Sequence, residues 1–466
     1  MSAIRPTLPK GTRDFLPEQM VRRQFVFDTI KTIFEKYGYE PLETPSIEKL
    51  DVLSGKYGDE GEQLLFKVLR RGTGLEQLQR GRQEFVVREY SQLVEEALRY
   101  DLTVPLSRVV AMHQNELILP FKRYQIQPVW RADRPQRGRY REFYQCDIDT
   151  VGTKSMLADA EAIAVVHEVL ATLGFENFSI RINNRKVLNG LLIHAGIAPE
   201  AGDAVFVVID KLDKIGLAGV KSELEKLGLS GKQVDKVLSV LQLSGESDSV
   251  LSELKSTLKD SEALAEGVDE LRKIVTYLNA MGIPESHYKI DLYLVRGLSY
   301  YTGPIHESVI EEPKMGSLTG GGRYDCLIGM FLGRDIAATG TAFGVERIID
   351  VMTQLEMFPE SQNSTQVLVT QFDDSTVEAS LGYVQLLRGA GIAAEFYFEA
   401  AKMKKQLSYA NKKAIPYVAF VGPDEVTKNQ VTLKDMRSGD QQTLAVTSSL
   451  EMLKKKIYGP GGRGNQ

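Results

Sequence analysis

The sequence has few of the residues that build disulfide frameworks and metal sites. Its 466 residues include two cysteines, Cys146 and Cys326, and five histidines. Two cysteines are too few for a disulfide framework or a cysteine-based zinc site, and the histidines have no metal-binding spacing such as HExxH. We therefore expect no tightly bound metal held by protein ligands, and we expect a reducing, cytoplasmic location.

Long apolar runs are absent from the sequence as well. No segment approaches the ~18–20 uninterrupted apolar residues of a membrane-spanning helix, and the first residues lack the apolar core of a secretory signal. With 43% hydrophobic and 26% charged residues, the composition is typical of folded globular proteins. The sequence thus predicts a soluble protein without membrane association, and its length predicts two or three domains, at ~150 residues per domain.

The first 354 residues predict a domain with an insertion. A helix is expected over residues 17–37, and a long β-hairpin over residues 122–152, where two strand patterns are joined by a charged loop. At about residues 195–280 the chain becomes rich in Leu, Lys and Glu with helical periodicity, which predicts a helical insertion. A polar linker is expected at residues 355–365.

The last part of the chain, residues 366–466, alternates strand and helix patterns. This alternation predicts a small α/β domain on a mostly parallel sheet. The whole chain has a net charge of −5, yet this last part carries slightly more basic than acidic residues. A mildly basic segment on an acidic body is compatible with contact to nucleic acid.

The loop of the predicted hairpin is rich in basic residues. Residues 122–141 hold seven of them and one acid, Asp133. One interpretation is a solvated charged loop. We favour a clamp for nucleotide phosphates, because the planar guanidinium group matches two phosphate oxygens at once. Phe143 lies two residues past Arg141, so it would share a strand face with that arginine and is placed to stack on a base.

A second arginine stands in the run LVRGLSYY at residues 294–301, where an apolar stretch meets two tyrosines. Adjacent residues of a strand point to opposite faces, so we expect at most one tyrosine to line a given pocket. The glycine run at residues 320–322 is either a place where backbone closely approaches a ligand or a tight turn. It is not part of a Walker A loop, because the pattern GxxxxGK[ST] does not occur.

Together these segments resemble the class II aminoacyl-tRNA synthetases, and within them the histidyl-tRNA synthetase family. Residues 129–143 (VWRADRPQRGRYREF) are similar to the second motif of the class, and residues 340–347 (GTAFGVER) to the third. The runs LVRGLSYY at 294–301 and GGGRYD at 320–325 are similar to two motifs of the histidine branch, and the opening PKGTRD at 9–14 also matches. The resemblance spans nearly the whole chain.

The resemblance implies an α+β catalytic domain on an antiparallel sheet, carrying the helical insertion and followed by a C-terminal α/β anticodon-binding domain. It implies a homodimeric histidine–tRNA ligase, which forms histidyl-adenylate from L-histidine and ATP and then transfers histidine to the 3′ end of tRNA(His). Mg²⁺ should accompany the ATP, and no metal held by the protein is implied.

The resemblance also implies which residues bind ATP. Arg131 would hold the α-phosphate, Arg139 and Arg347 the distal phosphates, and Phe143 would stack on adenine. Arg296 would lie between the carboxylate of the amino acid and the α-phosphate, at the place where other class II enzymes rely on a metal. Arg296 and Arg131 are therefore the implied catalytic residues.

A further set of residues is implied to bind histidine. Asp101 and Thr103 would hold its ammonium group, and Asp149 would face the imidazole. A carboxylate plus a phenol hydroxyl can satisfy the donor and the acceptor of neutral imidazole, and such a pocket can reject analogues by ~10⁴ or more. The implied histidine-binding residues are Asp101, Thr103, Gln145, Asp149, Arg296, Tyr300, Tyr301 and Tyr324.

Two features depart from the family pattern, and two other functions compete. Ser299 stands where many members have Asp, and residues 56–83 contain no motif that can be mapped. A regulatory, histidine-sensing paralogue of a biosynthetic enzyme usually lacks the anticodon domain and the ATP-contacting arginines, which are present here. A class II ligase for proline, threonine or glycine would not explain Arg296 together with Tyr301.

Overall fold

The computed structural model describes residues 5–55, 61, 63–70, 93–136, 138–257, 262–295, 300–359 and 365–459. The chain forms two compact units, residues 1–14 with 23–358 and residues 15–22 with 359–466. Arg296, Ser299 and most of the segment 56–83 lie outside the described residues.

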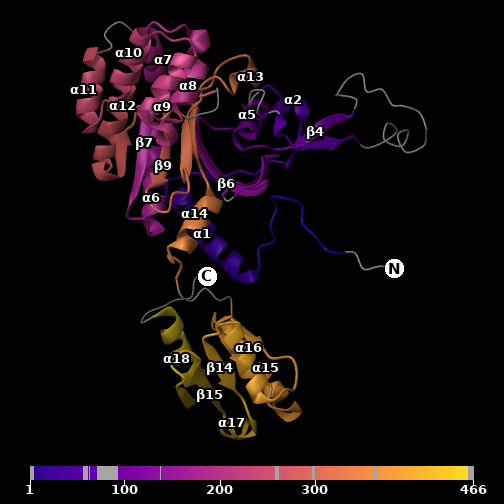
Figure 1. Ribbon diagram of the computed structural model, residues 1–466. Helices are drawn as coiled ribbons and strands as arrows, with labels where there is room; N and C mark the ends of the chain where they lie inside the picture. Colours follow the sequence, from indigo (N-terminus) through magenta and orange to yellow (C-terminus); the bar gives the residue numbers. More distant parts are fainter. Residues whose placement is uncertain are drawn as a thin grey trace. The chain divides into compact units, whose positions relative to one another are not determined.

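The first unit is built around an eight-stranded sheet with the strand order β1-β5-β6-β11-β10-β9-β7-β8 (Figure 1). Neighbours from β5 to β7 pair antiparallel, and only the edge pairs β1–β5 and β7–β8 are parallel. This confirms the antiparallel sheet that the resemblance implied. The strands are β1 (Glu40–Pro41), β5 (Phe121–Trp130), β6 (Glu142–Val151), β7 (Phe178–Asn184), β8 (Tyr288–Ile290), β9 (Pro304–Ile310), β10 (Thr319–Arg323) and β11 (Ala338–Phe343).

The predicted hairpin forms as β5 and β6, in register from Phe121 opposite Val151 to Trp130 opposite Glu142. Along β6, apolar and polar residues alternate, and both kinds are buried. Cys146 and Ile148 face the hydrophobic core. Since side chains alternate along a strand, Gln145, Asp147 and Asp149 share the opposite, polar face of the sheet.

Helices on the apolar side complete this core. Residues of α1 (Pro17–Lys36), α6 (Met156–Thr172) and α14 (Val345–Gln354) belong to one cluster with the strands. The side chain of Ser155 caps α6 by accepting a hydrogen bond from the Leu157 amide. A second cluster joins α2 (Leu50–Leu53), α5 (Thr103–Met112) and α13 (Gly329–Leu332). The three-stranded sheet beside it has the order β2 (Ile47–Lys49), β4 (Val94–Leu98) and β3 (Lys67–Leu69).

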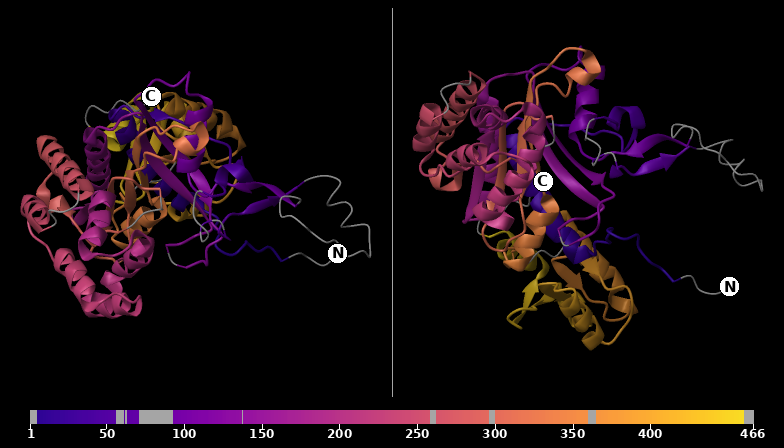
Figure 2. Two further views of the ribbon diagram at one scale, coloured as in Figure 1. Left: turned by 90° about the horizontal axis from the view of Figure 1, so that it is seen from above. Right: turned by 45° about the horizontal axis from the view of Figure 1, so that its top comes forward.

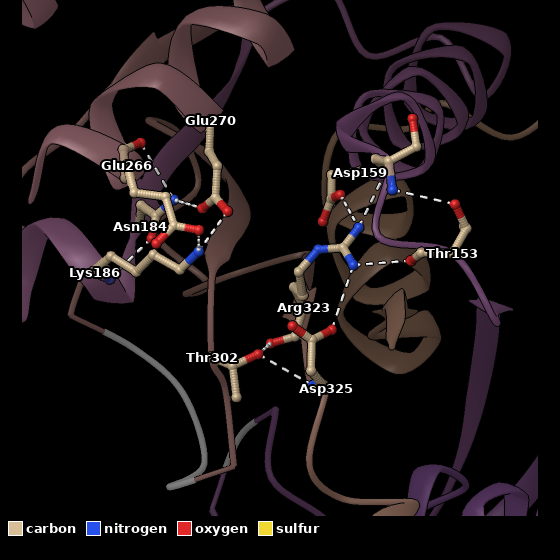
Figure 3. A network of polar contacts seen from close by, with 11 residues as sticks. Thr153, Asp159, Asn184, Lys186, Glu266, Glu270, Thr302, Arg323 and Asp325 are labelled. Atoms are coloured by element: carbon tan, nitrogen blue, oxygen red, sulfur yellow. Dashed lines mark hydrogen bonds and ion pairs between the residues drawn. The ribbon is translucent and has the colours of Figure 1, made fainter. Parts of the chain in front are cut away.

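The helical stretch lies between β7 and β8, and Figures 1 and 2 show its helices gathered at the same side of the sheet. Lys186 at the start of α7 pairs with Glu266 and Glu270 of α12, at 2.7 and 2.6 Å, so the first and last helices are tied together (Figure 3). The helices are α7 (Arg185–Ala195), η2 (Pro199–Ala201), α8 (Gly202–Ile209), α9 (Leu212–Lys226), α10 (Gly231–Leu241), α11 (Ser247–Thr257), α12 (Glu262–Ala280) and η3 (Glu285–His287).

The second unit has a five-stranded sheet with the order β13-β12-β14-β15-β16. β12 is parallel to β13 and β14, whereas β15 is antiparallel to β14 and β16. The sheet is therefore mixed, and the prediction of a mostly parallel sheet was wrong for its last two strands. Its elements are β12 (Val367–Val369), η4 (Asp374–Thr376), α15 (Val377–Gly389), β13 (Ala394–Phe396), α16 (Met403–Lys412), β14 (Tyr417–Phe420), α17 (Pro423–Lys428), β15 (Gln430–Asp435), β16 (Gln441–Ala445) and α18 (Val446–Tyr458).

Candidate active site

Two cavities adjoin on the polar face of the eight-stranded sheet. The larger cavity has a volume of about 490 Å³ and the smaller one about 270 Å³, and Arg131, Gln145, Gly320 and Ala342 line both. The residues implied to bind ATP, Arg131, Arg139, Phe143 and Arg347, line the larger cavity. Those implied to bind histidine, Asp101, Thr103, Gln145, Asp149, Tyr300, Tyr301 and Tyr324, line the smaller cavity. Arg296, the remaining implied residue, lies outside the described residues.

Arg131 stands at the junction of the two cavities, directly after the last residue of β5. Its Nε donates to the backbone oxygen of Tyr100 over 3.1 Å, and its Nη2 donates to Oε1 of Gln145 over 3.5 Å. The guanidinium carbon lies 4.3 Å from the centre of the Tyr100 ring and 5.1 Å from that of Phe143. Stacking of this kind holds the planar guanidinium in one orientation.

The other two arginines of the larger cavity, Arg139 and Arg347, differ in how they are held. The Arg139 side chain is 52% exposed and pairs with Asp133 at 3.6 Å, so it is able to move onto a ligand. Arg347 comes from the first turn of α14, and its Nη1 donates to the backbone oxygen of Ser317 over 2.8 Å. Phe143 lies on β6 and presents its ring to the same cavity. The cavity therefore combines an exposed arginine, a backbone-bonded arginine and an aromatic wall.

Glu346, next to Arg347, forms ion pairs that the sequence did not reveal. Arg13 reaches it at 2.5 Å and the buried Arg23 at 2.6 Å. Arg23 belongs to α1, so these pairs fix the start of α14 against α1 and the N-terminal segment. The partners are 333 and 323 residues apart in sequence, and no local pattern indicates their contact.

Asp149 is a buried carboxylate of the smaller cavity with two side-chain partners. Arg123, which is fully buried, pairs with its Oδ2 at 2.6 Å, and the Tyr324 hydroxyl donates to its Oδ1. Burial raises the pKa of Asp149 to about 6, although Arg123 acts in the opposite direction. A Cβ on Gly340 would lie 2.1 Å from Oδ1 of Asp149, so glycine is required beside this carboxylate.

Both Tyr300 and Tyr301 line the smaller cavity, which contradicts the expectation that at most one would do so. The expectation was wrong because these residues do not belong to a strand, and β9 begins only at Pro304. Their ring centres are 5.0 Å apart, and the Tyr324 ring lies 5.9 Å from that of Tyr300. Burial raises the pKa of Tyr301, so its hydroxyl stays protonated and can donate a hydrogen bond.

The glycine run at residues 320–322 lies within β10 and is not a tight turn. A Cβ on Gly321 would approach the Gly340 backbone oxygen to 2.1 Å, and one on Gly322 the Pro304 oxygen to 2.6 Å. Gly320, in contrast, lines both cavities. Gly321 and Gly322 therefore allow the neighbouring strands to pack closely. Gly320 exposes its backbone, without a side chain, where the two cavities meet.

A buried ion pair joins Asp159 to Arg323, the residue before Tyr324 in the sequence, and Figure 3 shows the ion pair with its surrounding polar contacts. Nη2 of Arg323 lies 2.5 Å from Oδ2 of Asp159 in α6, and its Nη1 donates to the Thr153 backbone oxygen over 3.0 Å. The backbone oxygen of Arg323 accepts a hydrogen bond of 2.9 Å from the Thr302 amide. Arg323 thereby fixes both its neighbour Tyr324 and the loop that carries Tyr301.

Three further buried residues belong to this region: Asp147 and His306, which were not predicted, and Arg123, which was expected in a phosphate clamp but pairs with Asp149 instead. Asp147 and His306 line the smaller cavity, and burial lowers the pKa of His306 to about 4. The alternation of polar residues at 145, 147 and 149 was a readable signal for Asp147. Among the described residues, no group of three or more His, Cys, Asp or Glu side chains is placed to hold a metal ion. No helix of the described part is long and apolar enough to cross a membrane.

Comparison with known proteins places the two units in known families. Residues 11–348 match the family model of histidyl-tRNA synthetase, and residues 366–456 match that of an anticodon binding domain. A histidine–tRNA ligase of Cytophaga hutchinsonii is 47% identical over 94% of this chain and 97% of its own length. One of Bacteroides fragilis is 46% identical over 97% of this chain and all of its own length.

The fold agrees with the sequence comparisons. The crystal structure of histidyl-tRNA synthetase from Nostoc sp. PCC 7120 superimposes with a TM-score of 0.85 at 33% identity, covering 98% of this chain and all of that one. The implied fold, an antiparallel class II sheet followed by an anticodon-binding domain, is confirmed. The chain belongs to the histidyl-tRNA synthetase family.

Proposed function

We propose that this chain is a histidine–tRNA ligase that joins L-histidine to tRNA(His) in two steps, with ATP as the energy source. The observation that carries the proposal is the pairing of the two cavities. An arginine-lined cavity suited to phosphates adjoins a smaller one that is lined by Asp149 and three tyrosines. Ligases related at 46–47% identity over nearly the whole chain support it.

ATP is placed in the larger cavity. Arg139 and Arg347 bind its distal phosphates, Arg131 binds the α-phosphate, and Phe143 stacks on adenine. Arginine is suited to these positions because its donors match phosphate oxygens in pairs. Mg²⁺ enters as part of the ATP substrate, where it neutralises the phosphates.

Histidine is placed in the smaller cavity. Asp149 accepts a hydrogen bond from one imidazole nitrogen and another from the Tyr324 hydroxyl, and the Tyr301 hydroxyl donates to the other imidazole nitrogen. Asp101 and Thr103 at the start of α5 hold the ammonium group, and Tyr300 packs beside them. The carboxylate then lies near Gln145 and Arg131, two of the residues that line both cavities.

The reaction follows from this placement. A carboxylate oxygen of histidine attacks the α-phosphorus of ATP, and the bond to pyrophosphate breaks. Arg131 and Arg296 stabilise the charge that develops, and fixed donors at such a position supply a large part of the acceleration. A terminal ribose hydroxyl of tRNA(His) then attacks the carbonyl carbon of the adenylate, and AMP leaves.

The remaining parts of the proposal concern organisation. We assign residues 1–354 to the catalytic domain with its insertion at about 195–280, residues 355–365 to a linker, and residues 366–466 to anticodon binding. The ligase acts as a homodimer in the cytoplasm. The alternative, a regulatory paralogue without ligase activity, is not favoured, because the ATP-site arginines and the match to the anticodon domain are both present.

The test is charging of tRNA with labelled histidine by the purified protein, combined with sedimentation analysis. We expect ATP-dependent, acid-precipitable histidine on tRNA(His) but not on tRNA of another specificity, and we expect a dimer. A protein that binds histidine but neither hydrolyses ATP nor charges tRNA would support the regulatory paralogue.

A further inference from the structure

The N-terminal segment, residues 9–14, has no role in the proposed function, yet it lies directly on the loop between β5 and β6. The Arg141 amide donates a hydrogen bond of 2.8 Å to the backbone oxygen of Gly11. A Cβ on Gly11 would lie 2.8 Å from Cγ of Arg141 and 2.9 Å from Cγ of Pro135, and the φ of Gly11 is +84°. Glycine is therefore required where the segment meets the loop.

Arg13 of this segment makes a second contact with the same loop. Its guanidinium carbon lies 3.3 Å from the centre of the Tyr140 ring. Its Nη2 donates to Oε2 of Glu346 over 2.5 Å, and the side chains of Arg13 and Glu346 are only 28% and 6% exposed. A planar guanidinium can stack on an aromatic ring and donate to a carboxylate at the same time. Arg13 thus joins the loop to the first turn of α14.

Tyr140 also contacts α14 directly. Its hydroxyl donates to Oδ2 of Asp350 over 3.3 Å. Burial raises the pKa of Tyr140, so the hydroxyl stays protonated and remains a donor. Glu346 and Asp350 are four residues apart in α14, so they lie on the same face of the helix. One face of α14 therefore holds both members of the stacked pair, Arg13 through Glu346 and Tyr140 through Asp350.

These contacts adjoin the two arginines that we propose to bind the distal phosphates. Arg139 directly precedes Tyr140, and Arg347 directly follows Glu346. The ion pair of the Arg139 side chain with Asp133 is long, at 3.6 Å, and half of that side chain is exposed. The place of Arg139 therefore depends on the backbone that Tyr140 anchors. Such placement matters, because a shift of ~1 Å at a site can lower a rate by about 10²-fold.

We propose that residues 9–14 act as an N-terminal strap and that Arg13 is a positioning residue for the nucleotide site. Arg13 holds the loop between β5 and β6 against α14, so that Arg139 and Arg347 face the distal phosphates of ATP together. The proposal rests on the proposed function, since it takes ATP as the occupant of the larger cavity. Arg13 itself does not line that cavity, so it acts on ATP through the residues that it contacts, which do.

The test is histidine-dependent ATP–pyrophosphate exchange by the full-length protein and its Arg13→Ala variant. We expect the KM of ATP to rise about tenfold, because a stacked, partly buried cation is lost and the loop is released. The KM of histidine should change less than about twofold, because the described lining of the smaller cavity includes neither Tyr140 nor Glu346. Lys10 of the same segment is exposed and supplies the matched control: Lys10→Ala also removes one positive charge, and both KM values should stay as in wild type.

A second measurement asks whether Arg13 acts through Tyr140. The effects of two residues that act through one another are not additive, so Arg13→Ala should raise the KM of ATP less than about twofold further in a Tyr140→Leu background. Arg13→Lys keeps the charge but loses the planar stack, and its KM of ATP should fall between those of wild type and Arg13→Ala. Amide hydrogen–deuterium exchange in the loop, measured without ligand, should be faster in Arg13→Ala than in wild type.

Three results would each overturn the role of Arg13: additive effects of Arg13→Ala and Tyr140→Leu, equal changes in the KM of ATP and of histidine, or unchanged hydrogen exchange in the loop. Thermal melts identify loss of folding, and Arg13→Gln, which also removes the charge, replaces Arg13→Ala if that variant is unstable. The proposed function fails separately. A wild-type protein without histidine-dependent pyrophosphate exchange overturns both proposals, whereas an active wild type whose Arg13→Ala variant keeps the KM of ATP overturns only the role of Arg13.

Discussion

The two adjoining cavities differ in how far the side chains that line them are buried. In the larger cavity the ligand-facing arginines are partly exposed, and Arg139 keeps half of its side chain in solvent. In the smaller cavity Asp101, Asp147, Asp149 and Tyr324 are all at least nine-tenths buried. Exposed arginines attract phosphates at little cost to the stability of the fold. Because exposed charges are screened by the solvent, they discriminate weakly between one anionic ligand and another. Burying polar groups lowers the stability of the fold. A ligand that leaves such a buried group without a hydrogen-bond partner binds much more weakly.

The difference predicts that the junction of the cavities is the most sensitive position. Arg131→Ala should lower the rate of histidine-dependent ATP–pyrophosphate exchange by about 10³-fold, because a fixed donor to the reacting phosphate is lost. Arg131→Lys keeps the charge but not the planar fork, and should recover only part of the rate. Single-turnover adenylate formation measures the effect. A loss confined to the KM of histidine would contradict the placement of Arg131.

Burial in the smaller cavity also predicts a pH effect on stability. His306 has a folded pKa of about 4, below its unfolded value of about 6.5, so its stabilising contribution is complete above pH 6.5 and is lost as the pH falls. Relative to wild type, His306→Phe should gain about 3 kcal/mol of unfolding free energy between pH 7 and pH 4. Urea unfolding at several pH values checks this, and parallel pH curves for the two proteins would refute it.

A smaller effect is expected from one hydroxyl group. Tyr324→Phe removes the donor to Asp149 and should lower kcat/KM for histidine by about 10- to 150-fold, since hydrogen bonds to charged groups contribute ~1.5–3 kcal/mol. The KM of ATP should stay the same, because Tyr324 does not line the larger cavity. Equal changes for both substrates would mean that the two cavities are not separate in function.

The smallest effect is expected in the larger cavity. Phe143→Leu should raise the KM of ATP by about fivefold to tenfold through lost stacking on the base, with little change for histidine. GTP and ATP compared in the same exchange assay provide the control, because stacking itself discriminates poorly among bases. A change in the KM of histidine larger than that of ATP would place Phe143 outside the nucleotide site.

How much of this structure the sequence predicts depends on how far apart in the sequence the interacting residues are. The β5–β6 hairpin and helix α1 followed from local alternation and periodicity. The hairpin of β15 and β16 was missed because its second strand is largely exposed and polar, so no apolar alternation marks it. The tyrosines at 300 and 301 were misjudged because strand geometry was assumed for a loop.

The site itself was predictable where residues belong to motifs, and hidden where they meet through the fold. The arginines of the larger cavity come from two contiguous runs, residues 129–143 and 340–347. The Arg123–Asp149 pair depends on the register of two strands, and the Arg13–Glu346 pair joins residues 333 apart. The alternation of polar residues along β6 indicates that Asp147 lies on the polar face of the sheet. The pattern alone does not predict which ligand group this carboxylate contacts.

The central claim is that the smaller cavity is specific for histidine and that the larger one activates it. The most direct test is amino-acid-dependent ATP–pyrophosphate exchange by the purified protein with each of the twenty amino acids. The account predicts exchange with histidine alone. Exchange with a different amino acid, or none with any of the twenty, would contradict it.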